Sequence, residues 1–198
     1  MTVPHHPAIA ARELILGGQK SGKSRRAEQL AVAWLAQSPA HQAVLIATAQ
    51  AHDAEMRERI ARHQRERAAR VPGLHTVEVP HDLAGALAAH GSAHTLVVVD
   101  CLTLWLTNWS MPFENFEQNM PLTQDWQAQK AMFLQALQES PGPVVLVGNE
   151  IGLGVIPLGA EVRAFVDALG TLNQRVAQVC TRVTLMAAGL PLCLKESA

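Results

Sequence analysis

Residues 17–24 read Gly-Gly-Gln-Lys-Ser-Gly-Lys-Ser and match the pattern of a phosphate-binding loop, Gly-x-x-x-x-Gly-Lys-Ser. The loop follows the apolar run 14–16 and precedes a helix-forming segment, which is the context that such a loop requires. Backbone N–H groups of a glycine-rich turn point toward phosphate oxygens, and the positive end of the following helix strengthens the attraction. The segment therefore predicts a nucleoside triphosphate site. The alternative is a glycine-rich turn that contains Gly-Lys-Ser by chance.

Every residue of this loop is a candidate nucleotide contact, and two side chains have a defined role. The candidates are Gly17, Gly18, Gln19, Lys20, Ser21, Gly22, Lys23 and Ser24. We expect Lys23 to reach the β- and γ-phosphates and to act in catalysis. Ser24 offers a hydroxyl to a Mg²⁺ ion, which bridges phosphate oxygens and prefers oxygen ligands.

Asp100 is the candidate for a second Mg²⁺ ligand. It ends the buried-strand pattern 95–100, and carboxylates at strand ends of an open α/β sheet face the ligand crevice near the phosphate-binding loop. The alternative is that Asp100 caps a helix that begins near Leu102, because Asp is a favoured capping residue. Both roles can coexist.

A second segment, 144–154, repeats this arrangement. The apolar run 144–147 is followed by Asn149 and Glu150 and then by a glycine-rich turn, so the pattern delivers polar groups to the same edge. A backbone without side chains can approach a ligand closely. Gly152 and Gly154 have the alternative role of only bending the chain.

Glu55, Arg59, His63 and Arg67 are spaced four residues apart and form one polar stripe on a helix. A neutral imidazole nitrogen is a nucleophile toward phosphorus, and neighbouring guanidinium groups would neutralise the phosphate oxygens. His63 is therefore a candidate catalytic residue. The alternative is a solvated helix face, because alternating charges on a helix are typical of one.

The order of the segments predicts an α/β fold with a mostly parallel central sheet and helices on both faces. The expected strands are 14–16, 44–47, 76–79, 96–100, 144–147 and 183–186, and the expected helices are 23–36, 54–69, 83–89, 126–139 and 161–179. The stretch 108–124 has no clear period and is interpreted as a long loop or lid. With the phosphate-binding loop, this pattern is typical of P-loop NTPases.

Composition limits the function classes. The 198 residues fit a single catalytic domain, 13–198, after a disordered or frayed tail, 1–12. A net charge of −1 gives no basic field for nucleic acid, and no apolar run reaches the roughly 18 residues of a membrane helix. Three widely spaced cysteines favour reduced thiols and a cytoplasmic location.

These residues together resemble the bifunctional adenosylcobinamide kinase / adenosylcobinamide-phosphate guanylyltransferase family of cobalamin biosynthesis. The matching segments are 17–24, 46–49, the series Asp53, Glu55, Met56, Arg59, Ile60, His63 and Arg67, then 76–78, 100–108, 149–157, and Arg163, Phe165, Asp167, Gly170, Asn173 and Gln174. Two departures stand out: Gln19-Lys20 replaces Ala-Arg in the loop, and Val166 stands where arginine is common. Lys20 keeps the charge, and the role of position 166 stays open.

The resemblance implies a two-step enzyme. It would first phosphorylate the aminopropanol hydroxyl of adenosylcobinamide with ATP or GTP. A histidine would then attack the α-phosphate of GTP, release pyrophosphate and pass GMP to the cobinamide phosphate, which gives adenosylcobinamide-GDP. His63 matches that histidine. His52 is the nearest competing histidine and has the alternative role of a solvated turn residue.

The resemblance also implies further nucleotide contacts and an assembly. The matching positions are Ala47, Thr48, Ala49, Gln64, Arg65, Glu66, Arg67, Glu78 and Asp100. Similar enzymes are homotrimers, so a homo-oligomer is expected. Two alternatives remain: a kinase without guanylyl transfer, and a P-loop regulatory module that switches at 149–154. Neither alternative has a use for His63. We also expect the loop 108–124 to close over the corrinoid or to order near it.

Overall fold

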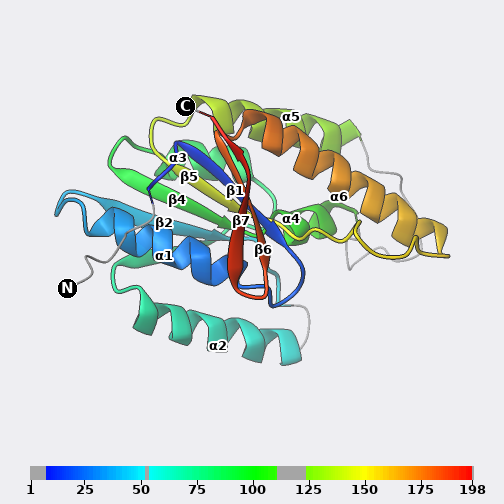
Figure 1. Ribbon diagram of the computed structural model, residues 1–198, viewed down its shortest axis with the longest axis horizontal. Helices are drawn as coiled ribbons and strands as arrows, with labels where there is room; N and C mark the ends of the chain where they lie inside the picture. Colours follow the sequence, from blue (N-terminus) through cyan, green and yellow to red (C-terminus); the bar gives the residue numbers. More distant parts are fainter. Residues whose placement is uncertain (1–7, 52–53, 111–123, 198) are drawn as a thin grey trace.

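The computed structural model describes residues 8–51, 54–110 and 124–197, apart from the side chains of Arg59 and Gln124. Their strands form one sheet in the order β3-β2-β4-β5-β1-β6-β7, in which β7 alone runs antiparallel to its neighbour (Figure 1). The strands are β1 Arg12–Gly17, β2 Gln42–Ala47, β3 Leu74–Glu78, β4 Thr95–Asp100, β5 Val144–Val147, β6 Arg182–Ala187 and β7 Leu190–Glu196. The expected mostly parallel α/β sheet is confirmed.

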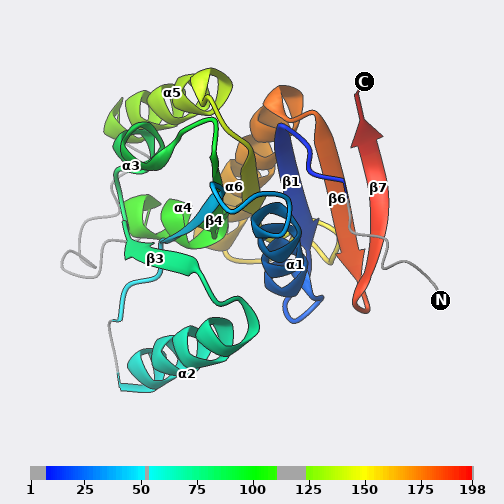
Figure 2. The same cartoon turned by 90° about the vertical axis from the view of Figure 1, so that its left-hand side faces the viewer.

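Helices lie on both faces of this sheet, as Figure 2 shows. The helices of the described residues are α1 Lys23–Leu35, α2 Ala54–Arg70, α3 Leu83–His90, α4 Leu102–Ser110, α5 Gln124–Glu139 and α6 Ala160–Val179, and all except α2 cover a face of the sheet. Side chains alternate along β4, so that Val97 and Val99 pack under α3 to α6, whereas Leu96 and Val98 pack under α1. Burial of β4 on both faces explains its continuous apolar sequence.

The larger core cluster lies between the sheet and helices α3 to α6, and aromatic rings fill its centre. Trp105 is fully buried, and its ring centroid lies 4.8 Å from that of Trp126 and 5.0 Å from that of Phe133. The indole Nε1 of Trp105 donates a hydrogen bond to the backbone oxygen of His81 at 2.7 Å, which satisfies the polar atom of a buried ring. This packing holds α4 in position, and α4 begins two residues after Asp100.

The sequence pattern located six of the strands and five of the helices within a few residues, and it missed β7. Leu190, Leu192 and Leu194 of β7 are exposed, so the apolar residues that usually mark a buried strand face outward here. Pro191 also weakens a strand pattern, although proline is tolerated on an edge strand. The turn before β7 uses Ala188 and Gly189 with φ of 51° and 80°.

Three expectations concern segments that lie partly or wholly outside the described residues. Helix α4 extends to Ser110, so the start of the expected loop 108–124 is helical, while 111–123 lies outside the description. His52 and Asp53 also lie outside it. Of the expected tail 1–12, residues 1–7 are not described, and Arg12 begins β1 and donates from Nε to the backbone oxygen of Leu137 at 2.6 Å.

Helix α2 lies beyond the edge of the sheet at β3 and does not cover a face of the sheet in either view (Figures 1 and 2). Its attachment is polar. Buried Glu28 of α1 accepts hydrogen bonds from Arg70 Nε at 2.7 Å and Nη2 at 3.0 Å, and it forms an ion pair with Arg67 Nε at 3.9 Å. A bidentate carboxylate–guanidinium pair is strong and directional, so Glu28 orients the C-terminal half of α2.

We predict that Glu28→Gln loosens α2 without unfolding the sheet. Removing one charge of a buried pair leaves the buried Arg67 without compensation, which costs about 3–5 kcal/mol. Hydrogen–deuterium exchange of the α2 amides should accelerate at least about tenfold, while exchange of β1 and β4 stays unchanged. Glu66→Gln is the matched control, because Glu66 is exposed and contacts the same Arg70 at 3.4 Å. Equal effects of the two substitutions would contradict the assignment.

Candidate active site

The loop between β1 and α1 has the geometry of a phosphate cradle. Gly17 and Gly22 have φ of 150° and 102°, and Lys20 has φ of 55°. Helix α1 begins at Lys23 and has no side-chain cap, so the N–H groups of its first turn remain available to an anion. The predicted strand–loop–helix context of residues 17–24 is therefore present.

The hairpin of β6 and β7 holds this loop in place. A Cβ at Gly17 would lie 2.5 Å from the backbone oxygen of Met186 and 2.6 Å from Ser21 Oγ, so only glycine fits. The backbone N–H of Gly189 donates to the backbone oxygen of Ser21 at 3.0 Å. Ser21 Oγ is buried and has no hydrogen-bond partner among the described residues. A phosphate oxygen is a suitable partner for such a hydroxyl.

Lys23 is the first residue of α1, and its side chain reaches back to the phosphate-binding loop. Its side chain is buried, and its Nζ donates to the backbone oxygen of Gly18 at 2.6 Å, across the loop. Desolvation lowers the pKa of Lys23, while the neighbouring Cys101 and Asp100 act in the opposite direction. Asp100 is therefore close enough to interact with the loop lysine, which is the proximity expected of a second Mg²⁺ ligand. Ser24, the other candidate ligand, is partly buried in the first turn of α1.

Three of the expected nucleotide contacts form a row at the carboxyl ends of adjacent strands. Ala47 of β2 is in register with Glu78 of β3 on one side and with Asp100 of β4 on the other. Asp100 is in turn in register with Val147 of β5, the strand next to β1. The structure therefore brings these residues to the edge that carries the phosphate-binding loop, as parallel topology requires.

Thr48 has a supporting role that the sequence did not indicate. It is fully buried, its Oγ1 donates to the backbone oxygen of Cys101 at 2.7 Å, and the same Oγ1 accepts from the Cys101 N–H at 2.9 Å. Asn108 Nδ2 donates to the backbone oxygens of Thr48 and Pro80, both at 2.9 Å. Both hydrogen bonds of the Thr48 hydroxyl therefore go to the segment that follows Asp100. The peptide bond between Asp100 and Cys101 is cis. Partly buried Ala49 follows Thr48.

Cys101 is not a reactive thiol. Burial, with a smaller contribution from the charge of Asp100, raises its pKa to about 12. The thiolate is the reactive form of cysteine, so Cys101 is inert near neutral pH.

Residues 149–154, which follow β5 in the second segment, also contact the phosphate-binding loop, mainly through their backbone. The N–H of Glu150 donates to the backbone oxygen of Gly17 at 3.2 Å, and the N–H of Asn149 donates to Thr103 Oγ1 at 2.9 Å. The Glu150 carboxylate accepts from the Gly152 N–H at 2.9 Å. This contact supports the turn interpretation for Gly152, and it places Glu150 beside the loop.

The residues expected to form one polar stripe on α2 lie in different environments. His63 is exposed, whereas Arg67 is buried, pairs with Glu28 and donates from Nη1 to Thr76 Oγ1 at 3.5 Å. Within the described residues, no hydrogen bond or ion pair connects His63 to the phosphate-binding loop. Arg67 therefore anchors the helix and does not face the solvent with His63.

The expected contacts next to His63 have their own partners. Gln64 Nε2 donates to Glu78 Oε1 at 3.1 Å, so α2 reaches the strand end at β3. Glu66 pairs with Arg70, and Arg65 is exposed.

Asn173 of α6 is a site residue to which the sequence assigned no role. It is 4% exposed and sits within the apolar face formed by Leu169, Leu172 and Val176. Its Nδ2 donates to the backbone oxygen of Asn149 at 3.0 Å, and its Oδ1 has no hydrogen-bond partner in the described part of the chain. A polar residue within an apolar helix face was the signal that could have identified it.

Together, the parallel sheet, the glycine-rich cradle, the buried lysine and the adjacent aspartate define a P-loop NTPase fold. In a comparison with solved structures, the flagellar accessory protein FlaH from Methanocaldococcus jannaschii superposes with a TM-score of 0.50 at 12% sequence identity, over 96% of this chain and 80% of FlaH. At that identity the likeness concerns the fold alone.

Comparison with known sequences identifies the family. The model of the cobinamide kinase / cobinamide phosphate guanyltransferase family matches residues 13–194, so the chain belongs to this family of enzymes. The bifunctional adenosylcobalamin biosynthesis protein CobP of Pseudomonas aeruginosa is 46% identical over 185 residues, which are 93% of this chain and 97% of CobP. CobU of Salmonella typhimurium and CobU of Escherichia coli, both named bifunctional adenosylcobalamin biosynthesis proteins, are each 33% identical over 189 residues, 92% of this chain and 98% of CobU. The sequence resemblance is thereby confirmed.

One further observation concerns membranes. Among the described helices, none combines the length and the apolar character needed to cross a bilayer.

We predict that Gly17→Ala removes triphosphate binding and lowers the free energy of unfolding by about 1–3 kcal/mol, because the added Cβ meets the backbone of Met186 and forces the loop out of place. Gly18→Ala is the control for the free energy of unfolding, because a Cβ there has no protein atom within 4 Å. Urea unfolding and equilibrium binding of GTP check both variants. Similar behaviour of the two alanine variants would contradict the steric argument.

Proposed function

We propose that the phosphate-binding loop holds the triphosphate for both family reactions and that, in the second reaction, His63 carries GMP from GTP to the cobinamide phosphate. The observation that carries the proposal is the cradle at residues 17–24 with buried Lys23 and nearby Asp100. In the kinase step, the loop and Lys23 hold the γ-phosphate of ATP or GTP while the aminopropanol hydroxyl of adenosylcobinamide attacks it. The bond between the γ-phosphorus and the β–γ bridging oxygen breaks, the phosphoryl group passes to the hydroxyl oxygen, the nucleoside diphosphate leaves, and the hydroxyl proton passes to water.

The guanylyl step uses a different phosphorus of GTP. A nitrogen of His63 attacks the α-phosphorus, the bond to the bridging oxygen breaks, and pyrophosphate leaves. An oxygen of the cobinamide phosphate then attacks the phosphoramidate, and the N–P bond breaks to give adenosylcobinamide-GDP. The exposure of His63 supports this role, because the imidazole is accessible to both substrates. Residues 47–49, 64–67 and Glu78 would hold the rest of the nucleotide.

Mg²⁺ fits the oxygen donors at this edge. Ser24 supplies a hydroxyl and Asp100 a carboxylate, and Mg²⁺ sites in nucleotide enzymes use one or two protein oxygens together with phosphates and water. The ion would neutralise charge on the phosphates. Lys23 and the loop N–H groups orient the triphosphate, and Asp100 helps to keep Lys23 charged.

We further propose that the enzyme acts in the cytoplasm on small molecules, without a nucleic-acid partner, and assembles as a homo-oligomer, with a trimer as the expected number. The net charge of −1 supports the absence of a nucleic-acid partner. Leu190 and Leu192 on edge strand β7 are 71% and 57% exposed, and such an apolar edge is suited to contact with another subunit.

We predict that His63→Ala abolishes covalent GMP transfer and leaves most of the kinase activity. The test incubates the protein with Mg²⁺ and GTP labelled at the α-phosphate, and it maps acid-labile, base-stable label by mass spectrometry. His75→Ala, which changes another exposed histidine, should keep the label. Retained label in the His63 variant would overturn the covalent role. If the wild-type protein binds GTP but carries no label, the two alternatives remain: a kinase without guanylyl transfer, or a nucleotide-dependent switch.

We predict that Asp100→Asn lowers both rates by roughly 10²-fold or more at saturating substrate, because a carboxylate that holds positive charge beside the phosphates is lost. The Mg²⁺ concentration for half-maximal rate should rise as well. Asp82→Asn is the control, because Asp82 caps α3, where Oδ1 accepts from the Gly85 N–H. An unchanged Mg²⁺ requirement in Asp100→Asn would remove Asp100 from the metal site.

A further inference from the structure

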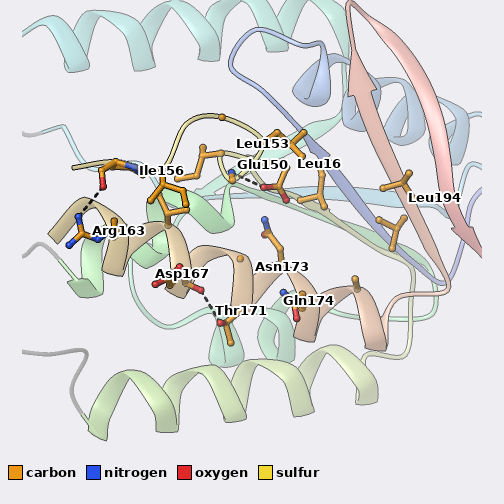
Figure 3. Close-up of a pocket in the computed structure, with 18 of the residues that line it drawn as sticks. Leu16, Glu150, Leu153, Ile156, Arg163, Asp167, Thr171, Asn173, Gln174 and Leu194 are labelled. Atoms are coloured by element: carbon orange, nitrogen blue, oxygen red, sulfur yellow. Dashed lines mark hydrogen bonds between the residues drawn. The ribbon is translucent and has the colours of Figure 1, made fainter. Parts of the chain in front are cut away.

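A cavity of about 900 Å³ lies beside the phosphate-binding loop, between α6 and the segment 150–157. Figure 3 shows side chains of both segments facing it, with Leu16 of β1 and Leu194 of β7 at its sides. None of the residues assigned above to the nucleotide lines this cavity. Its volume is within the range of small-molecule sites.

One end of the cavity lies next to the first residue of the phosphate-binding loop. Leu16, which lines it, directly precedes Gly17, and Glu150, which also lines it, donates from its backbone N–H to the oxygen of Gly17 at 3.2 Å. The row of expected nucleotide contacts extends from the other side of β1, through β4 and β2 to β3. A molecule in the cavity would thus approach the phosphates from the side opposite to that row.

Asn173 lines the cavity and carries an unused hydrogen-bond acceptor. Its amide group faces the backbone oxygen of Asn149, which can only accept, so the nitrogen must be the atom on that side. The remaining atom, Oδ1, is therefore an acceptor, and it is buried without a partner in the described residues. An unpaired buried acceptor is unfavourable, and a ligand N–H would satisfy it.

The remaining lining suits a large, weakly charged molecule with apolar surface. Leu153 and Ile156 are 81% and 76% exposed, and Val166 adds a third apolar side chain to the lining. Arg163 already donates from Nη1 to the backbone oxygens of Pro157 and Leu158. The Lys195 ammonium likewise donates to backbone oxygens of α6. Glu150 and Asp167, which also line the cavity, balance these two cations, so the lining lacks the net positive charge that a second triphosphate would require.

We propose that this cavity binds the corrinoid acceptor, with Asn173 Oδ1 accepting a hydrogen bond from one of its side-chain amides. The proposal rests on the proposed function, because it takes the acceptor to be a cobinamide. A cobinamide is a large ring that carries methyl groups and primary amides on its rim, so it offers both the apolar surface and the N–H donors that the lining requires. Bound there, it places its aminopropanol hydroxyl toward the phosphate-binding loop.

The test compares two exposed leucines that are close in the chain: Leu153, which lines the cavity, and Leu158, which lies outside it, are 81% and 98% exposed. Leu153→Asn should raise the Kd for cobinamide about five- to tenfold, measured by equilibrium dialysis through the visible absorbance of the corrinoid. Leu158→Asn should leave this Kd unchanged. Labelling of His63 by GTP should be normal in both variants.

Asn173 provides an independent comparison. Asn173→Asp and Asn173→Leu both lose the N–H donated to Asn149, but only the Asp variant keeps an acceptor oxygen. Cobinamide binding should therefore be about fivefold weaker in the Leu variant than in the Asp variant, while GTP binding is equal in the two. If either variant does not fold, the leucine comparison decides.

Equal cobinamide affinity in Leu153→Asn, Leu158→Asn and the wild type would overturn the assignment. A changed subunit number of Leu153→Asn with unchanged cobinamide affinity would also overturn it, because a second copy would then cover the cavity. Failure of the wild type to bind cobinamide would overturn the proposed function together with this site. Loss of GMP labelling with intact, Leu153-dependent cobinamide binding would overturn only the covalent role of His63 and would support the cavity assignment.

Discussion

The close contact between Gly17 and the carboxyl end of β6 is the constraint on which the site depends. No side chain larger than hydrogen fits between the Met186 backbone and Ser21, so strand β1, the phosphate-binding loop and β6 hold one another in position. Backbone hydrogen bonds from Gly189 and Glu150 to the same loop add two further supports from different parts of the chain. The cradle is therefore preorganised by main-chain packing, which suits a site that must bind phosphates through N–H groups.

The sequence predicted the parts of the molecule whose local signals agree with their tertiary environment. Loop 17–24 and buried strands such as β4 carry motifs or apolar runs that the structure reproduces. It failed where the environment reverses the local signal: the leucines of β7 face outward. Arg67 also reads as part of a solvated stripe but is buried against Glu28. Side-chain roles such as that of Thr48 require partners distant in sequence, which no local pattern encodes.

The two sides of the site are held by different kinds of interaction. Around the phosphate-binding loop, buried backbone and the apolar clusters fix the geometry. Helix α2 is attached by a carboxylate shared between two arginines and by the contact from Gln64 to Glu78, so its position depends on charge and hydrogen bonds. Arg70, Gln64 and Glu78 are exposed, so their contacts compete with water, whereas apolar packing does not. The candidate nucleophile therefore belongs to a less strongly held element than the loop that it must serve.

The hairpin contact at Gly189 also has a consequence for how the enzyme is made. The phosphate-binding loop leaves the ribosome long before the residues that hold it, Met186 and Gly189, because these follow it by more than 150 positions in the chain. Domains tend to fold as units as the chain emerges, and contacts between distant parts of the sequence form late. A nascent chain therefore carries an incomplete cradle until β6 and the turn to β7 have emerged. Nucleotide binding at the loop would then begin only after β6 and this turn have emerged, so a product that ends before them would carry the loop sequence without its binding geometry.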